Sequence, residues 1–191
     1  MAVVGPESSG KTTLVEHLAS WLRDRGIPVA VVPEQGRLLA ERLPAGHKWS
    51  YREELATSRM HRGAEAAAEV VLAATHPRGI VLTDGSAATP LVWHLCAVHS
   101  RPHYDAGPPG ATEELRTAVQ ASTYDLVLVT APDLAWVADG VRDDPDGREA
   151  AFAEYRRLYP RAVVVSGTER ELIAERVVHG LIGGSIGVWQ P

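Results

Sequence analysis

Short apolar runs recur along the chain, and longer polar stretches with helical spacing separate them. Five runs are rich in valine, isoleucine or leucine and do not alternate with polar residues: Ala2–Val4, Val29–Val32, 79–83, 125–130 and 162–165. Non-alternating runs of this length are typical of parallel strands that are covered on both faces. The pattern therefore predicts five buried strands.

The stretches between these runs predict helices. Residues 12–25 place Leu14, Leu18 and Leu22 on one side, and Gly26 follows where a helix would end. Similar patterns predict helices over 51–75, 112–121, 146–159 and 169–182. Strands that alternate with helices imply right-handed β-α-β crossovers and hence an α/β fold with a five-stranded parallel sheet and flanking helices.

The length of the chain and its lack of repeats indicate a single domain. Its 191 residues are enough for a single domain with a substantial core and too few for two ordinary ones. No internal repeat or low-complexity tract divides it. We expect one domain over residues 1–182 and a loose C-terminal tail over 183–191.

A phosphate-binding loop follows the first apolar run. Its pattern is Gly-x-x-x-x-Gly-Lys-Thr, and the nucleotide-binding candidates are Gly5, Glu7, Ser8, Ser9, Gly10, Lys11, Thr12 and Thr13. Glycines let the backbone N–H groups converge on phosphate oxygens, and the following helix N-terminus adds positive charge. Lys11 can reach the β- and γ-phosphates, while the Thr12 hydroxyl can ligate Mg²⁺. The loop predicts ATP and Mg²⁺ as cofactors and a three-layer P-loop NTPase fold.

The second predicted strand is followed by "PEQGR", which contains Glu34 and Arg37. Ligands of open parallel sheets gather at the carboxyl ends of the strands. A carboxylate there can orient and deprotonate an acceptor hydroxyl, and an arginine can pair with it or with phosphate. We therefore expect Glu34 to be catalytic and both residues to bind substrate. The alternative is a surface Glu–Arg pair at the start of a helix.

The third predicted strand is followed by Asp84, which suits a Mg²⁺ ligand, a kinase base or a substrate-binding group. Its alternative is the N-cap of a helix, because aspartate caps helices well. Trp93 follows nine residues later. The sequence favours a core position for this side chain, but an aromatic side chain near a strand end can also stack on a flat ring.

Residues 124–155 predict a lid. A buried strand ends at Thr130, and a Gly/Asp-rich segment then contains Trp136, Asp139, Arg142 and Arg148. Phosphoryl transfer depends on positioning and on positive charge at the moving group, so we expect both arginines to be catalytic. Trp136 and Asp139 are candidates for substrate binding. The alternative is a solvated charged loop.

The fifth predicted strand is followed by Ser166, Gly167 and Thr168. We expect Gly167 and Thr168 to pack against the nucleotide base. Thr168 also fits the N-cap of the next helix, with Glu171 completing a capping box.

Four segments together resemble the ribosylnicotinamide (nicotinamide riboside) kinase domain of NadR-type proteins. They are "GPESSGKTTL" (5–14), "EQGR" (34–37), "ATSRMHRGAEAAA" (56–68) and "PDLAWVADGVRDDPDGREAAF" (132–152), of which the last is the most specific. The resemblance implies ATP-dependent phosphorylation of the ribose 5′-hydroxyl of nicotinamide riboside to give nicotinamide mononucleotide. It also implies that Lys11 and Thr12 bind phosphate and Mg²⁺ and that Arg142 and Arg148 act from a lid.

The sequence departs from that family at two places, of which the first bears on the choice of acceptor. The family's Asp-Thr-Asp after the third strand is here Asp84-Gly85-Ser86, and Ala135 replaces the proline before Trp136. The chain also has no room for the nucleotidyltransferase domain of fused NadR proteins. We therefore expect a standalone kinase or a relative with a changed acceptor.

The composition of the chain indicates which kinds of binding partner and which compartment to expect. The formal net charge is −5, which gives no global attraction to nucleic acid or anionic membrane, and no segment resembles a signal peptide or a membrane span. The single cysteine, Cys96, excludes an internal disulfide and reads as a small buried hydrophobe in a cytoplasmic protein. We expect a small-molecule nucleoside substrate, and a homodimer is compatible with the sequence. A regulatory or ATP-hydrolysing P-loop NTPase remains the alternative, as does a kinase-like protein with an altered acceptor pocket.

Overall fold

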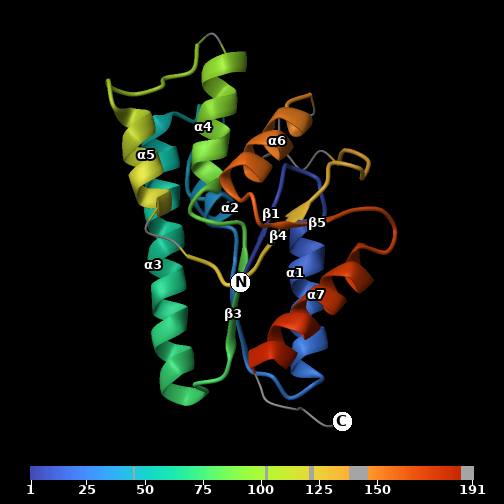
Figure 1. Cartoon of the computed structure of the whole chain (residues 1–191). Coiled ribbons are helices and arrows are strands. Elements are labelled where there is room, and N and C mark those ends of the chain that lie inside the picture. Colours follow the sequence, from blue (N-terminus) through green and yellow to red (C-terminus); the bar gives the residue numbers. More distant parts are fainter. Residues whose placement is uncertain (45, 102, 121–122, 138–145, 186–191) are drawn as a thin grey trace.

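The protein is described by a computed structural model that covers residues 1–44, 46–101, 103–120, 123–137 and 146–185. In this part of the chain, five parallel strands form one sheet in the order β2-β3-β1-β4-β5 (Figure 1). The strands are β1 (Ala2–Val4), β2 (Val29–Val32), β3 (Ile80–Asp84), β4 (Val127–Thr130) and β5 (Val163–Val165). The helices are α1 (Lys11–Arg23), α2 (Gln35–Ala40), α3 (Tyr51–Thr75), α4 (Thr89–Ser100), α5 (Ala111–Gln120), α6 (Arg148–Leu158) and α7 (Arg170–Ser185). The predicted α/β P-loop architecture is confirmed.

The helices form two layers around the sheet (Figure 1). Helices α1 and α7 pack on one face, while α3, α4 and α6 cover the other. Helix α5 packs outside α3 and α4, and the short α2 lies against α3. None of the described helices is both long and apolar enough to cross a bilayer.

Strand β1 lies at the centre of the core. Val3 belongs to the cluster shared with Leu14 and Leu18 of α1, whereas Val4 belongs to the opposite cluster with Val92 and Tyr155. All six side chains are at most 1% exposed. Truncating such a buried leucine to alanine costs about 2–5 kcal/mol of stability, so the strand that carries the phosphate-binding loop is held from both sides.

The bounds of the predicted strands are confirmed to within two residues. The predicted burial on both faces, however, does not hold for every strand. Strands β2 and β5 are the edges of the sheet, and Val31 and Val164 on them are 40% and 37% exposed. The prediction of burial on both faces therefore holds for the central strands only. An edge strand has one neighbour, and the helix layers do not reach fully over it.

Helices α2 and α4 were not predicted. Helix α2 has only six residues, too few to show a periodic pattern. Helix α4, "TPLVWHLCAVHS", is apolar on most sides, because it lies between α3, α5 and α6. At the C-terminus, α7 continues to Ser185, so residues 183–185 are helical and not part of a loose tail; residues 186–191 lie outside the described ones.

Candidate active site

The phosphate-binding loop joins β1 to α1 at the carboxyl edge of the sheet. Gly5 and Gly10 have φ angles of +151° and +80°, which side-chain-bearing residues rarely adopt. A Cβ atom on Gly5 would lie 2.2 Å from Oγ1 of Thr130, so the loop passes directly against the end of β4. Ser8 also has a positive φ, +52°, as found at constrained functional loops. The tight wrapping that the sequence predicted is present.

Lys11 lies inside this loop. The residue is 6% exposed, and its Nζ donates a 2.9 Å hydrogen bond to the carbonyl oxygen of Pro6. Ser9 Oγ donates to the same carbonyl at 2.7 Å and shares a 2.6 Å hydrogen bond with Thr130. A buried ammonium is expensive without a partner, so these contacts keep the positive charge beside the loop.

Thr12 and Asp84 meet next to Lys11. The exposed Thr12 donates from Oγ1 to Oδ2 of Asp84 at 2.6 Å, while Asp84 is 4% exposed. Burial raises the pKa of Asp84, against the opposing influence of Thr12 and Lys11. Within the described residues, Oδ1 of Asp84 is buried without a hydrogen-bond partner. A hydroxyl beside a carboxylate oxygen with no protein partner is a donor set that suits Mg²⁺.

Asp84 does not cap a helix. It ends β3, and α4 begins five residues later at Thr89 with Ala88 at the N-cap position. The capping alternative for Asp84 is therefore wrong. Thr168 is likewise not the cap of α7, because that helix begins at Arg170.

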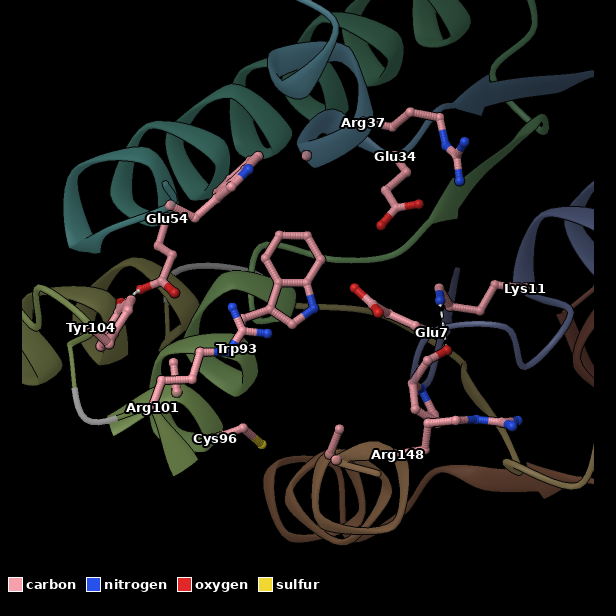
Figure 2. A pocket seen from close by; sticks show the side chains of 16 residues that line it. Glu7, Lys11, Glu34, Arg37, Glu54, Trp93, Cys96, Arg101, Tyr104 and Arg148 are labelled. Carbon is pink, nitrogen blue, oxygen red and sulfur yellow. Dashed lines mark hydrogen bonds between the residues drawn. The ribbon is translucent and has the colours of Figure 1, made fainter. Parts of the chain in front are cut away.

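A cavity of about 130 Å³ opens beside the loop (Figure 2). Six predicted site residues from distant segments line it: Glu7, Lys11, Glu34, Arg37, Trp93 and Arg148. Also in its wall are Pro6, Gly36, Trp49, Glu54, Cys96, Ala97, Arg101, Tyr104, Gly147 and Ala151. The structure thus brings the strand-two carboxylate to the phosphate-binding loop, as the sequence analysis required.

Trp93 projects from α4 into the middle of this cavity (Figure 2). Its ring lies edge-on to that of Trp49, with centroids 5.9 Å apart. A Cβ atom on Gly36 would lie 2.6 Å from Cη2 of Trp93, so a glycine is required for α2 to approach the ring. The arrangement offers a flat aromatic surface between the Lys11 end and the Glu54 end of the cavity.

The segment after β4 docks on the phosphate-binding loop. Ser8 Oγ donates to the carbonyl of Val137 at 3.0 Å, and the Val137 N–H lies 3.2 Å from the same Oγ. Arg148, the first residue of α6, donates to the carbonyls of Leu134 and Ser8 at 2.9 and 3.3 Å. Trp136 is half-buried but is not among the cavity-lining residues that the structure describes. Asp139 and Arg142 lie outside the described residues.

Arg170, which the sequence analysis missed, joins three loops. It donates from Nη1 to the Ser9 carbonyl at 2.8 Å, from Nε to the Gly167 carbonyl at 3.0 Å and from Nη2 to Oδ1 of Asp133 at 2.5 Å. Gly167 N–H donates to the other Asp133 oxygen. Burial alone would raise the pKa of Asp133, but these hydrogen bonds outweigh it and lower the pKa. Arg170 thereby connects Gly167 to Ser9 of the phosphate-binding loop.

Ser86 is not among the described cavity-lining residues, whereas Cys96 is. Ser86, which replaces the second family carboxylate, is 1% exposed, and its Oγ contacts Tyr159 Oη at 3.1 Å, away from the cavity wall. Cys96 is half-buried: it packs against the core cluster of Val4, Val92 and Tyr155 but also lines the cavity, so the predicted burial is only partial. The sequence of helix α4 has no periodic pattern of apolar residues, so the direction in which Cys96 faces could not be predicted.

Comparisons with solved structures reveal a shared fold. A NadR protein in complex with NAD and AMP-PNP is 21% identical to this chain, with a TM-score of 0.65. A NadR protein in complex with NR is also 21% identical, with a TM-score of 0.66. In both comparisons all of this chain aligns with half of the NadR chain. Thymidylate kinase from Candida albicans is 15% identical with a TM-score of 0.66, over 96% of this chain and 91% of the kinase. The chain thus spans about half the length of the NadR chains.

Comparison of the sequence with other proteins and with family models identifies a family. No curated protein sequence matches the chain. Residues 1–169, however, match the family model AAA_28, described as an AAA domain. With the phosphate-binding loop between β1 and α1 and the all-parallel sheet, this match establishes that the chain belongs to the AAA_28 family of P-loop domains.

Proposed function

We propose that the protein is an ATP-dependent kinase that phosphorylates the ribose hydroxyl of a nucleoside, with nicotinamide riboside, converted to nicotinamide mononucleotide, as the leading acceptor. The single observation that carries the proposal is the cavity that has Lys11 at one end and Glu34 and Trp93 in its wall. A nucleotide switch or an ATP-hydrolysing module has no need of a carboxylate and an aromatic surface beside its phosphate-binding loop. A kinase needs both, one for the hydroxyl and one for the base.

The proposed transfer assigns a role to each group. Glu34 takes the proton from the ribose hydroxyl, whose oxygen then bonds to the γ-phosphorus of ATP. The bond from that phosphorus to the bridging oxygen breaks, and ADP leaves with the electron pair. Lys11 and Arg148 stabilise the negative charge on the transferring group, and Arg142 is proposed to assist from the lid.

The residues that would hold Mg²⁺ are Thr12 and Asp84. The Thr12 hydroxyl lies beside the Asp84 carboxylate, and Oδ1 of Asp84 has no hydrogen-bond partner among the described residues. Bound Mg²⁺ would supply positive charge to the phosphate oxygens. Gly167 and Thr168 are proposed to lie beside the adenine. The support for this is that Arg170 donates to the carbonyls of both Gly167 and Ser9, which holds Gly167 next to the phosphate-binding loop.

The acceptor proposal rests on the character of the cavity wall. Trp49 and Trp93 offer aromatic faces, and the carboxylates of Glu7 and Glu34 line the same space. Lys11, Arg37, Arg101 and Arg148 line the cavity as well. The aromatic faces, rather than the net charge of the wall, therefore favour a flat ring that can carry positive charge, as in a pyridinium nucleoside. The shared fold with NadR structures, one of them bound to NR, supports the same acceptor.

The test is ADP release from ATP, measured with and without a panel of ribonucleosides that includes nicotinamide riboside. Acceptor-dependent release, with phosphorylated nucleoside detected by mass spectrometry, is the expected result. Release that is independent of acceptor would indicate an ATP-hydrolysing module instead. No release under either condition would indicate a kinase-like protein whose acceptor pocket has lost activity. Lys11→Ala serves as the inactive reference.

A further inference from the structure

A buried polar cluster closes the end of the cavity opposite Lys11. Glu54 of α3 accepts a short hydrogen bond from Tyr104 Oη and lies 3.1 Å from Nδ1 of His94 on α4, both through Oε2. His94 Nε2 lies 2.9 Å from the Thr112 hydroxyl of α5. Glu54 and Tyr104 are also cavity-lining residues. The cluster therefore connects three helices to one wall of the acceptor cavity.

The burial of this cluster limits how its groups are protonated. Glu54 and His94 are 2% and 1% exposed. Burial lowers the pKa of His94, so its ring is neutral at pH 7. A neutral ring that donates from Nδ1 to Glu54 accepts at Nε2 from Thr112, which satisfies both nitrogens. Oε2 of Glu54 then accepts from His94 and from Tyr104.

The second oxygen of Glu54 is oriented differently. In Figure 2 the oxygen that bonds Tyr104 points away from the cavity, whereas the other, Oε1, points toward the space next to Trp93. Along the cavity the order is Lys11, Trp93 and Glu54. A nucleoside with its ribose at the Lys11 end and its base on Trp93 would bring the outer edge of the base to Glu54.

We propose that Glu54, positioned by Tyr104 and His94, determines acceptor specificity by donating a hydrogen bond from Oε1 to a carbonyl group on the outer edge of the nucleoside base. The inference rests on the proposed function and adds the class of base: a ring with a carbonyl or carboxamide substituent. A buried site made to hydrogen bond with a substrate group rejects analogues that lack the group, because its own polar atom is then left unpaired.

The direction of the hydrogen bond follows from the cluster. Burial raises the pKa of Glu54 to about 8, in spite of the opposing influence of Tyr104 and Arg101, so the carboxyl is mostly protonated at pH 7. When His94 is in the tautomer that donates from Nδ1, Oε2 accepts from two donors, and the carboxyl proton is then on Oε1. A protonated Oε1 donates, and its natural partner is a carbonyl oxygen.

The test compares the binding of two ligands by quenching of tryptophan fluorescence, which needs no phosphoryl transfer. The ligands are nicotinamide riboside and the pyridinium riboside without the carboxamide. The wild type should prefer the carboxamide by about 10- to 100-fold, as expected for a hydrogen bond to a buried polar group. Glu54→Ala should reduce the preference to below about threefold, whereas Glu54→Gln, whose amide can also donate, should restore most of it.

Two further variants separate specificity from folding. Tyr104→Phe removes only the hydroxyl that positions Glu54 and should weaken the preference by about three- to tenfold. Glu113→Gln, which changes an exposed carboxylate on α5, is the matched control and should leave it unchanged. Circular dichroism verifies that each variant is folded.

The outcomes distinguish the two proposals. An unchanged preference in Glu54→Ala, or equal affinities in the wild type, would overturn the role of Glu54 even if the protein phosphorylates nucleosides. Loss of the preference in Glu54→Gln as well as in Glu54→Ala would overturn the donor assignment. Absence of any phosphorylation, with the preference intact, would overturn the kinase proposal alone.

Discussion

The hydroxyl of Thr12 donates a 2.6 Å hydrogen bond to Oδ2 of Asp84, and this contact joins the first turn of α1 to the carboxyl end of β3. The two residues are 72 positions apart in the sequence. Both strands that position them, β1 and β3, are hydrogen-bonded neighbours in the sheet. The fold therefore creates a hydroxyl–carboxylate pair next to Lys11, at the place where phosphate would bind.

The first prediction concerns this pair. Asp84→Asn keeps the size of the side chain and the hydrogen bond from Thr12 but removes the negative charge. We expect kcat for phosphoryl transfer to fall by at least about 100-fold, because the charge that would hold Mg²⁺ is lost. The measurement is ADP release as a function of Mg²⁺ concentration.

A matched variant is Asp125→Asn, an exposed aspartate just before β4 at the opposite edge of the sheet. It should leave both kcat and the Mg²⁺ dependence unchanged. An Asp84→Asn protein with the wild-type Mg²⁺ dependence would show that Asp84 has a purely structural role.

The second prediction concerns the proposed base. Glu34 lines the cavity at the start of α2, where its side chain makes no capping hydrogen bond. Glu34→Gln should therefore lower kcat by about 10²- to 10⁴-fold, the usual contribution of a general base, with little change in the KM for ATP. Initial-rate kinetics with both substrates varied give this result directly.

The control is Glu41→Gln, an exposed carboxylate immediately after α2, which should behave as the wild type. Equal losses in kcat and in ATP affinity for Glu34→Gln would instead indicate that Glu34 maintains the structure of the loop.

The sequence predicted the parts of this site that local patterns encode. The loop at Gly5–Thr12 and the positions of Glu34 and Asp84 after their strands follow from the spacing of glycines and from the ends of apolar runs. Because all five strands are parallel, their carboxyl ends meet at one edge, and a list of strand-end residues becomes a candidate site.

The remaining parts depend on contacts that no local pattern records. Glu54 lies inside a long helix with nothing in its neighbours to distinguish it from a solvated charge, and its partners Tyr104 and His94 are 50 and 40 positions away. Arg170 resembles any helix-initiating arginine until its three acceptors are known. Helix α4, apolar on most sides, gave no periodic pattern that would have revealed Trp93 and Cys96 as cavity-lining residues.

The third prediction concerns the junction of loops at Arg170. Arg170→Ala removes three hydrogen bonds and leaves the carboxylate of Asp133 without its ion-pair partner. We expect a loss of about 2 kcal/mol in the free energy of unfolding, since hydrogen bonds to charged groups contribute about 1.5–3 kcal/mol each and part of the loss is relieved by water. The KM for ATP should also rise, because Ser9 and Gly167 are no longer fixed relative to each other.

Thermal unfolding and ATP kinetics measure both effects, and Arg176→Ala, an exposed arginine on the same helix, is the control. Arg170→Lys should recover little of the loss, because an ammonium cannot donate to three separated acceptors as the guanidinium does. A variant with reduced stability but the wild-type KM for ATP would confine Arg170 to a structural role.

The last prediction uses the pH dependence of stability. Burial raises the pKa of Glu54 from 4.5 to about 8 in the folded protein, with Glu53 adding to the rise and Tyr104 and Arg101 opposing it. The folded state therefore binds a proton that the unfolded state has already released near neutral pH. This contribution to stability is complete below pH 4.5 and is lost as the pH rises through about 8.

Between pH 7 and pH 9 this loss should amount to about 1.4 kcal/mol in the wild type, the value of one pKa unit. Glu54→Gln, which cannot ionise, should show no corresponding decline, so the difference in Tm between the two proteins should shift by about 3–6 °C over this range. The window lies above the ordinary pKa of histidine, where His94 is neutral in both states, and burial raises the pKa of Tyr104 well above it. Parallel unfolding curves for the two proteins across this range would show that Glu54 is ionised in the folded protein, and the hydrogen bond from Oε1 would then have to run from the ligand to the carboxylate.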